Sequence, residues 1–252
     1  MYFHKRLNGR KYYVFGVNVI DDSMLKIELI SYTKDPEITC AKCASLSWRR
    51  KGMKDFSLDE AREIIRRVLS FGHESVIEHA SFTFFVEGVS RALTHQLVRH
   101  RIASYTQQSM RYVNLSKLER YFIKPKSIVK NQKLNKLFDD VMTKCKKSYD
   151  SFVKRGIPPE DARFVLPIAT QTKIAITMNA RELRHFFAMR CCLRAQWEIR
   201  ELANRILKLC KSVAPSLFEN AGPSCIRLKY CPENELTCGK LEQVLEMYRD
   251  KH

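Results

Sequence analysis

The segment from Ser90 to Arg111 concentrates side chains that can bind anions and form hydrogen bonds. It combines arginines, histidines, glutamines and serines, and few apolar residues interrupt its second half. Arginine presents a planar fork of N–H donors that suits phosphate and carboxylate oxygens. The segment therefore predicts a binding site for an anionic small molecule that is rich in hydrogen-bonding groups.

Helical spacing adds a constraint on this segment. Ser90 is suited to cap a helix, on which Gln96, Arg99 and His100 would share one face. Arg101 would point to roughly the opposite side. Either the helix ends near here, or Arg99 and Arg101 reach ligands in different subunits. The alternative for an isolated Arg-His-Arg is a solvated helix end, where arginines lie near the last carbonyls.

The longer pattern is more specific. Arg99-His100-Arg101 is followed, after seven residues, by Ser109 and then by Arg111-Tyr112. This pattern resembles the signature of the flavin-dependent thymidylate synthases, the ThyX family. The resemblance covers roughly Met24 to Phe218. It also takes in His73-Glu74-Ser75, Ala162-Arg163, Val165-Leu166-Pro167, Asn179-Ala180-Arg181, Arg190 and Ala195-Gln196-Trp197-Glu198.

This resemblance implies an activity, its cofactors and an assembly. The expected reaction is the reductive methylation of dUMP to dTMP. FAD would be the cofactor, NADPH the reductant and methylenetetrahydrofolate the carbon donor. The fold would be α+β, with an antiparallel sheet packed with long helices. The chain would form a homotetramer whose sites are shared between subunits.

The resemblance also assigns residues. The positions on the flavin side are His73, Ser75 (from a neighbouring subunit), Arg99, His100, Arg101, Gln107, Asn179, Arg181 and His185. The positions on the dUMP side are Gln96, Arg99, Gln107, Gln108, Ser109, Met110, Arg111, Arg163 and Arg190, of which Arg190 is the candidate catalytic residue. Gln108 and Met110 are expected to act through their backbone groups. Some family members have Glu in place of Gln107 and Asn in place of His185.

Two alternatives concern the chemistry. Ser109 could act as a nucleophile only with a neighbouring base, so we interpret it as a binding and orienting hydroxyl. A related flavin enzyme could methylate UMP or a modified pyrimidine, because the sequence does not separate these nucleotides.

Composition bounds the remaining possibilities. The 252 residues suit one sizeable core, and the net charge of +18 suits either small anionic substrates or nucleic acid. No aromatic-basic platform supports nucleic-acid binding, which we regard as the less favoured class. With eight glycines and no Gly-rich fingerprint, a Rossmann unit is not expected. No membrane span and no secretory leader are expected, and the nine cysteines suit a reducing cytoplasm.

Several clusters could suggest a metal, but none is expected to bind one. Cys40 and Cys43 have the spacing of half a zinc site without a second matched pair. His73 and His79, with their neighbouring carboxylates, lack the spacing of a metalloprotease motif. Cys225, Cys231 and Cys238 lie in a loop-rich tail, where they could bind metal or each other. Free structural thiols are the favoured interpretation.

The order of expected elements predicts an α+β fold without βαβ repeats. Strands are expected at 24–30, 82–87 and 172–178, and a strand with a turn at 112–125. Helices are expected to end near Ser47, to run from the Ser57 capping box to Gly72, and to cover 126–155. Pro158 would open a short helix, Asn179 would cap the next, and a long helix over 199–213 would end at Pro215. The expected divisions are an extension at 1–23, a catalytic domain at 24–219 and a cysteine-containing tail at 220–252.

Overall fold

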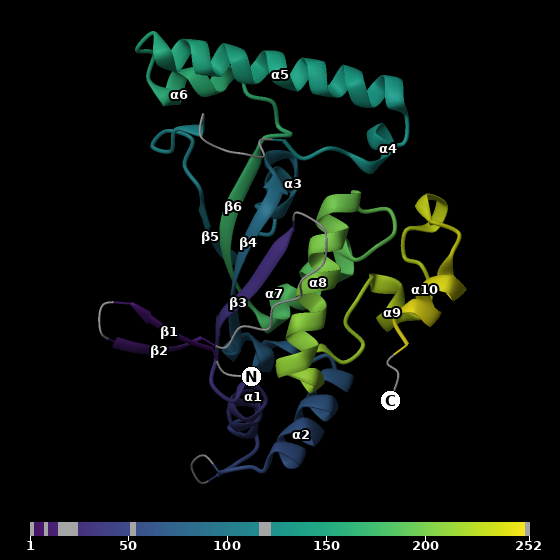
Figure 1. Cartoon of the computed structure of the whole chain (residues 1–252). Helices are drawn as coiled ribbons and strands as arrows, with labels where there is room; N and C mark the ends of the chain where they lie inside the picture. Colours follow the sequence, from purple (N-terminus) through teal and green to yellow (C-terminus); the bar gives the residue numbers. More distant parts are fainter. Residues whose placement is uncertain (1–2, 8–9, 15–24, 51–53, 116–121, 250–252) are drawn as a thin grey trace.

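An antiparallel sheet of four strands forms the centre of the molecule (Figure 1). The computed structural model describes the chain except residues 1–2, 8–9, 15–24, 51–53, 116–121 and 250–252. The strand order is β3-β4-β6-β5. The strands are β3 (Lys26–Tyr32), β4 (Ser81–Ser90), β5 (Ala103–Gln107) and β6 (Gln171–Asn179). The order agrees with an α+β fold, because every pairing in this sheet is antiparallel.

Alternation along β4 explains why one face of the sheet is covered. Phe82, Phe84 and Val86 are fully buried, whereas the residues between them are only partly buried. Phe84 lies opposite Ile176 of β6, which is also buried. On the other face, the hydroxyls of Thr83 and Thr177 are 3.0 Å apart and share a hydrogen bond. The apolar face is the one that packs against helices.

Helices make up most of the remaining structure. The α-helices are α1 (Pro36–Ser45), α2 (Leu58–Ser70), α3 (Arg91–Leu97), α4 (Lys126–Val129), α5 (Gln132–Lys154), α6 (Pro159–Ala162), α7 (Ala180–Arg190), α8 (Trp197–Val213), α9 (Ser224–Leu228) and α10 (Leu241–Met247). Short 3₁₀ helices are η1 (Glu74–His79), η3 (Arg163–Val165), η4 (Pro215–Phe218) and η5 (Asn234–Leu236). A separate antiparallel hairpin, β1 (Phe3–Leu7) and β2 (Arg10–Val14), lies within the expected extension.

The main core joins the sheet to α7 and α8. Phe82 of β4 packs edge-on against Phe218, with ring centroids 5.4 Å apart, and Phe187 of α7 contacts the same ring at 5.9 Å. Leu202 and Ile206 belong to the buried stripe of α8. Since α7 follows β6 directly, this packing fixes where α7 begins relative to the sheet.

Several expected elements are confirmed. Ser57 and Glu60 form the capping box of α2, and Gly72 follows that helix with a φ of 77°. This left-handed conformation is one that glycine adopts without steric penalty. Asn179 caps α7, and α8 ends at Val213. Cys40 and Cys43 lie on α1.

One expectation is wrong, one is tested only in part, and one strand was not expected. The expected helix over 126–155 is two helices, because Lys130 ends α4 and Asn131 caps α5 with its side chain. Residues 116–121 of the strand and turn expected at 112–125 lie outside the described residues, and the described part of that range holds a turn and a bridge between Phe122 and Thr170. β5 was not expected, because its side chains alternate only between partly buried and exposed and none belongs to the buried core.

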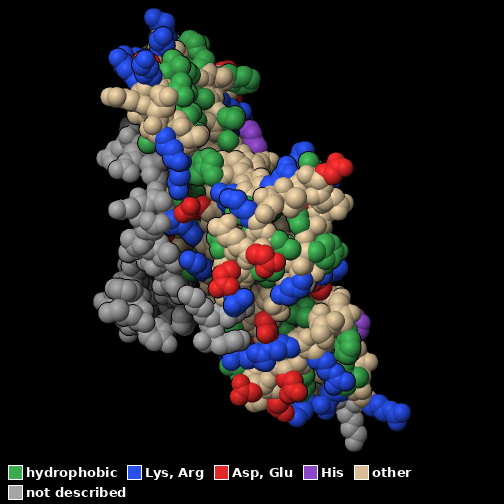
Figure 2. Space-filling view, turned by 90° about the vertical axis from the view of Figure 1, so that its right-hand side faces the viewer, with side chains coloured by type: hydrophobic (Ala, Val, Ile, Leu, Met, Phe, Trp, Pro, Cys, Tyr) green, Lys and Arg blue, Asp and Glu red, His purple; other side chains and the backbone are tan. Residues whose placement is uncertain are grey.

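Helix α5 and the surface charges lie outside the main core. α5 extends at one end of the sheet (Figure 1), and Tyr149 is its one buried residue. On the face in Figure 2, Lys and Arg side chains are spread among acidic and apolar ones. No helix in the described ranges has the length and apolar composition needed to cross a membrane.

Candidate active site

The start of α7 lies at one edge of the main candidate site. Asn179 is the last residue of β6, and its Oδ1 accepts a hydrogen bond of 2.9 Å from the backbone N–H of Glu182. This cap leaves the amide NH₂ of Asn179 able to contact a ligand. Arg181 lies in the first turn of the same helix. A helix N-terminus favours anions, and the adjacent guanidinium adds to that preference.

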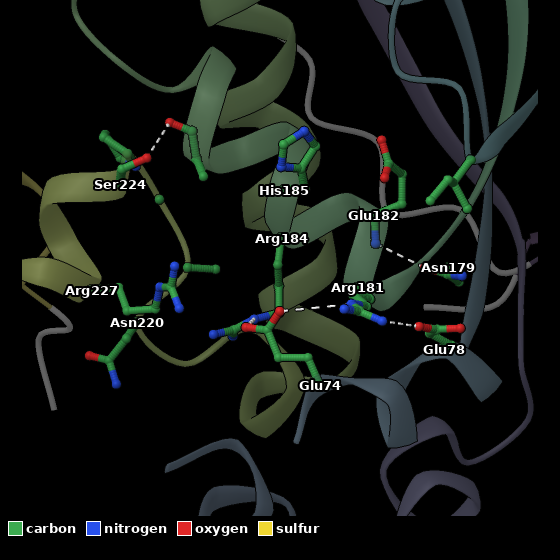
Figure 3. A pocket seen from close by; sticks show the side chains of 15 residues that line it. Glu74, Glu78, Asn179, Arg181, Glu182, Arg184, His185, Asn220, Ser224 and Arg227 are labelled. Carbon is green, nitrogen blue, oxygen red and sulfur yellow. Dashed lines mark hydrogen bonds and ion pairs between the residues drawn. The ribbon is translucent and has the colours of Figure 1, made fainter. Parts of the chain in front are cut away.

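A pocket of about 500 Å³ opens beside this helix start (Figure 3). Its lining residues include Glu74, Glu78, Asn179, Arg181, Arg184, His185 and Arg227. Figure 3 shows Asn220 and Arg227 across the pocket from Asn179 and Glu78. The tail beyond residue 219 therefore contributes a cation to the pocket, although the resemblance stops at about Phe218.

The arginines of this pocket differ in how firmly they are held. Arg181 is exposed and forms an ion pair with Glu78. Arg184 is mostly buried, donates to the carbonyl oxygens of Leu217 and Glu219 at 3.0 and 3.1 Å, and lies 3.8 Å from Glu74. Burial lowers the pKa of Arg184. Exposed ion pairs contribute little stability, so an anionic ligand could displace Glu78 from Arg181 at small cost.

His100 links this pocket to Arg190. The His100 side chain is buried, and its Nδ1 lies 3.3 Å from Oε1 of Glu182. Its Nε2 accepts a hydrogen bond of 3.1 Å from Nε of Arg190. Its ring contacts His185 edge-on, with centroids 5.6 Å apart. Because Nε2 must offer a lone pair to Arg190, the hydrogen bonds assign the tautomer that carries its proton on Nδ1.

The electrostatics agree with a neutral His100. Burial lowers the pKa of His100 to about 4, and the charges of Arg190 and His185 act in the same direction. Burial also raises the pKa of Glu182. The contact between His100 and Glu182 is therefore a hydrogen bond at neutral pH, although its geometry would also allow an ion pair if His100 were protonated.

Arg190 faces away from Arg181, as its position nine residues later on an unbroken helix predicts. Besides His100, its guanidinium approaches the carbonyl oxygen of Gln96 at 3.5 Å. Burial lowers the pKa of Arg190. The structure thus places Arg190 outside the pocket that contains Arg181. His100, which contacts both Arg190 and the pocket residue His185, lies between Arg190 and that pocket.

A second cationic group lies around Arg111 and Arg163. Nε of Arg111 is 2.8 Å from Oε2 of Glu160, and Nε of Arg163 donates to the carbonyl of Glu160 at 3.0 Å. The Oγ of Ser109 accepts from the backbone N–H of Arg111 at 3.1 Å. Arg91 belongs to the same group, because Arg163 contributes to lowering the pKa of Arg91. Clustered guanidiniums with one carboxylate suit a phosphate-bearing ligand.

Three predicted substrate residues make contacts within the chain. The amide of Gln107 donates to Oγ1 of Thr94 at 3.0 Å and approaches Oγ1 of Thr172 at 3.3 Å. The backbone of Gln108 donates to Lys173 and accepts from Arg91. Met110 is buried in a small cluster with Tyr149, Leu115 and Ala162. These contacts position the chain leading to Ser109 and Arg111.

Four predicted residues are not brought to these groups. Arg99 and Arg101 are exposed, and in the described ranges neither side chain forms a hydrogen bond or an ion pair. His73 and Ser75 are exposed and do not line the pocket, although their neighbour Glu74 does. Helix α3 ends at Leu97. The helix-face argument for placing Arg99 and Arg101 in different subunits therefore no longer applies.

Sequence reasoning missed several residues of these groups. Glu182 was considered only as part of a helix start, yet it holds His100. Arg91 has a buried Nε without a hydrogen bond. Arg227 lies beyond the family resemblance. The three-residue spacing from Asn179 to Glu182 was visible in the sequence, but no local pattern signals a contact with His100, which lies 82 residues away.

His100, Glu182 and His185 are also close enough for a metal ion, since one ligand atom from each lies within 4.8 Å of the others. Arg190, however, donates to Nε2 of His100. A guanidinium bound to a potential ligand atom competes with a cation for it, so these residues fit a hydrogen-bond network better than a metal site.

Comparisons with known proteins identify the family of the chain. The family model described as thymidylate synthase complementing protein matches residues 28–216. A protein of Geobacter sulfurreducens named flavin-dependent thymidylate synthase is 48% identical over 230 residues, which cover 90% of this chain and 99% of that protein. A protein with the same name from Clostridium tetani is 45% identical, over 89% of this chain and 97% of that protein. Another from Pyrococcus abyssi is 46% identical, over 84% of this chain and 91% of that protein. The chain therefore belongs to the thymidylate synthase complementing protein family, whose members include these flavin-dependent thymidylate synthases.

Proposed function

We propose that the chain is a flavin-dependent thymidylate synthase that converts dUMP to dTMP. Family membership supports the activity. The structural observation that supports it best is Arg190, which a neutral His100 positions near the pocket that contains Arg181. This arrangement supplies one site for a phosphate-bearing cofactor and a separate guanidinium for the substrate.

We propose FAD as the flavin that binds in this pocket. Asn179, Arg181 and His185 would hold it, since a helix start and a guanidinium suit its pyrophosphate. The exposed side chains of Arg99 and Arg101 have no partner in the described ranges and would contact the flavin together with His73 and Ser75. The chemistry that bound FAD would supply there is hydride transfer and relay of the carbon donated by methylenetetrahydrofolate, with NADPH as the proposed reductant.

The second cationic group is proposed to bind dUMP. Arg111 and Arg163 would bind the phosphate, and Ser109 would orient the nucleotide with its hydroxyl. Gln107, Gln108 and Met110 would hold this segment in place. Arg190, oriented by Gln96 and His100, would stabilise negative charge that develops on the uracil ring as its C5 bonds to the new carbon.

We also propose a homotetramer whose sites are shared between subunits. The exposed Arg99, Arg101 and Ser75 support this, because their predicted ligand contacts are not completed within one chain. The nine cysteines are all free thiols. This state favours a reducing compartment, and we propose the cytoplasm.

One assay tests the activity. The protein is incubated anaerobically with reduced FAD, methylenetetrahydrofolate and dUMP, and the nucleotides are separated by chromatography. We expect dTMP only when all three components are present. UMP is supplied in parallel, and its methylation in preference to dUMP would replace the substrate assignment. Absence of any methylated nucleotide from a flavin-loaded preparation would contradict the proposed activity.

A further inference from the structure

Four cysteines line one small enclosed cavity on the tail side of α7. Cys192 lies in the connection that follows α7, and Cys225 lies in α9. Cys231 and Cys238 come from the tail segment between α9 and α10. The cavity has a volume of about 20 Å³. Residues far apart in the sequence thus direct four thiols to one place.

The tail segment has almost no apolar core of its own. Within 229–240, every side chain is exposed except Cys231 and Cys238, which are partly buried. Ordering a segment of this length costs conformational entropy that its exposed side chains cannot offset by burial. Its two inward-facing residues are therefore the natural anchors, and cysteine is a weak anchor unless its sulfur is bound to something.

Chemistry and size narrow what the four thiols could bind. Thiolates are the ligands of soft transition metals, and zinc is commonly bound by four of them in a tetrahedral site. A cavity of about 20 Å³ admits one water-sized object. That volume suits a single ion and is too small for a cluster of iron and sulfide. The four cysteines are free thiols, so disulfides do not already join them.

The four thiols are near enough to influence the pKa of Cys225, but their sulfur atoms are not as close together as the ligands of one bound ion. Burial and the neighbouring Cys192, Cys231 and Cys238 raise the pKa of Cys225. Among the described residues, His100, Glu182 and His185 form the group whose potential ligand atoms all lie within 4.8 Å of one another. The four cysteine sulfurs are therefore farther apart than this. Cysteine has one side-chain torsion, so each sulfur can move between staggered positions without backbone motion.

We propose that Cys192, Cys225, Cys231 and Cys238 bind one zinc ion as a structural four-thiolate site. Binding displaces the thiol protons, and the ion holds the tail against the end of α7. Cys192 is two residues after Arg190, so the ion would also fix the connection that follows the candidate catalytic residue. The site is independent of the proposed reaction, because no substrate or flavin contact involves these cysteines.

Zinc content provides the direct test. Full-length protein is purified without a metal-binding tag in a reducing buffer, and its metals are measured by mass spectrometry. We expect about one zinc ion per chain. Cys231→Ser and Cys238→Ser should lower this to near none. Cys145→Ser is the matched control, because Cys145 is a partly buried cysteine on α5 outside the cavity, and it should retain the zinc.

A second measurement does not depend on how the variants fold. The wild-type protein is exchanged into cobalt, and the visible spectrum is recorded at wavelengths longer than flavin absorption. Tetrahedral thiolate coordination should give intense cobalt bands, which Cys145→Ser retains. In the same wild-type protein, a chelator should lower the melting temperature and make four further thiols reactive.

Three results would overturn the proposal. The first is wild-type protein that folds and contains no zinc and gives no thiolate–cobalt bands. The second is iron with acid-labile sulfide in place of zinc. The third is loss of free thiols that reductant restores, which would identify a disulfide. Each of these leaves the proposed thymidylate synthase activity untouched, so the two proposals fail separately.

Discussion

Arg190 is the residue whose environment most directly predicts a catalytic effect. A hydrogen bond to His100 and the carbonyl of Gln96 hold its guanidinium, yet no carboxylate among the described residues pairs with it. Such a cation is suited to stabilise developing negative charge, an effect worth about 3–4 kcal/mol for one donor. Arg190→Ala should therefore lower single-turnover dTMP formation by roughly two to three orders of magnitude.

Flavin binding separates a catalytic effect of Arg190 from loss of the fold. Because Arg190 faces away from the pocket that contains Arg181, FAD titration of Arg190→Ala should match that of the wild type. Arg190→Lys should recover only part of the turnover, since a point charge cannot reproduce the planar fork. Wild-type dTMP formation by Arg190→Ala would assign the charge a structural role only.

His100 makes the stability of the molecule depend on pH. Its pKa is about 4 in the folded protein, against an ordinary value near 6.5. The unfolded chain therefore binds the proton more readily than the folded one. The stability that the neutral ring provides is complete above about pH 6.5, and it is lost as the pH falls toward 4. Between these two pH limits, the contribution of His100 to the free energy of unfolding changes by on the order of 3 kcal/mol.

This prediction is checked by measuring the free energy of unfolding between pH 7 and pH 4.5. The wild type should lose more stability over this range than His100→Gln, whose amide does not titrate. His73→Gln is the matched control, because His73 is exposed, and it should follow the wild type. Parallel curves for the wild type and His100→Gln would show that His100 does not bind the proton more weakly when folded.

At the scale of elements, a buried carboxylate joins α8 to the turn between β4 and α3. The two oxygens of Glu198 each lie 2.6 Å from a Ser90 donor, the backbone N–H and the hydroxyl. The same Ser90 hydroxyl caps α3 by accepting from Leu93 at 3.0 Å. Burial raises the pKa of Glu198, while the bonds from Ser90 oppose this. One side chain of α8 thereby fixes where α3 starts.

Removal of this carboxylate should destabilise the protein. Glu198→Ala leaves two buried donors of Ser90 without an acceptor, which costs about 2–3 kcal/mol. Urea unfolding measures this loss. Glu246→Ala is the control, since Glu246 forms an exposed pair with Arg249 and should change stability by less than about 0.5 kcal/mol. Equal stability of the two variants would show that Glu198 contributes nothing to this junction.

The same scale shows what the sequence could and could not predict. Helices with caps and regular apolar spacing, such as α2 and α7, were predicted because local residues determine them. β5 was missed because it lies at the edge of the sheet and has no buried side chain, so it lacks the apolar residues that mark a core strand. The break at Asn131 was missed because the apolar spacing that predicts the helix begins only at Leu134, and the expected helix was extended back to residue 126 without it. The Asn131 side chain caps α5.

For the site, residue types were predictable but contacts were not. The family pattern named His100 and Arg190 separately, and their hydrogen bond depends on how α3 and α7 pack. Helix periodicity alone predicted that Arg181 and Arg190 lie on opposite sides of α7. The contribution of Arg227 required the tail to fold back on α7, which no local pattern indicates.

At the scale of the whole molecule, one chain does not complete the predicted site. Arg101 is exposed and its side chain forms no hydrogen bond or ion pair with other described residues, whereas Arg190 is held within its own chain. A homotetramer with shared sites would bring Arg101 of one subunit to the flavin beside another. Light scattering at micromolar concentration should therefore give the mass of four chains. A fully active monomer would exclude this assembly.

Mixing two inactive variants tests whether a site is shared. Arg101→Ala should purify folded but colourless, since an arginine that would hold the pyrophosphate is missing. Arg190→Ala should bind FAD without turnover. If each site takes Arg101 and Arg190 from different subunits, dissociation and reassembly of an equal mixture restores both residues at about a quarter of the sites. We expect dTMP formation at roughly that fraction of the wild-type rate. Separate Arg101→Ala and Arg190→Ala preparations treated identically should remain inactive. No recovery in a mixture whose subunits have demonstrably exchanged would place Arg101 and Arg190 at a site in the same subunit.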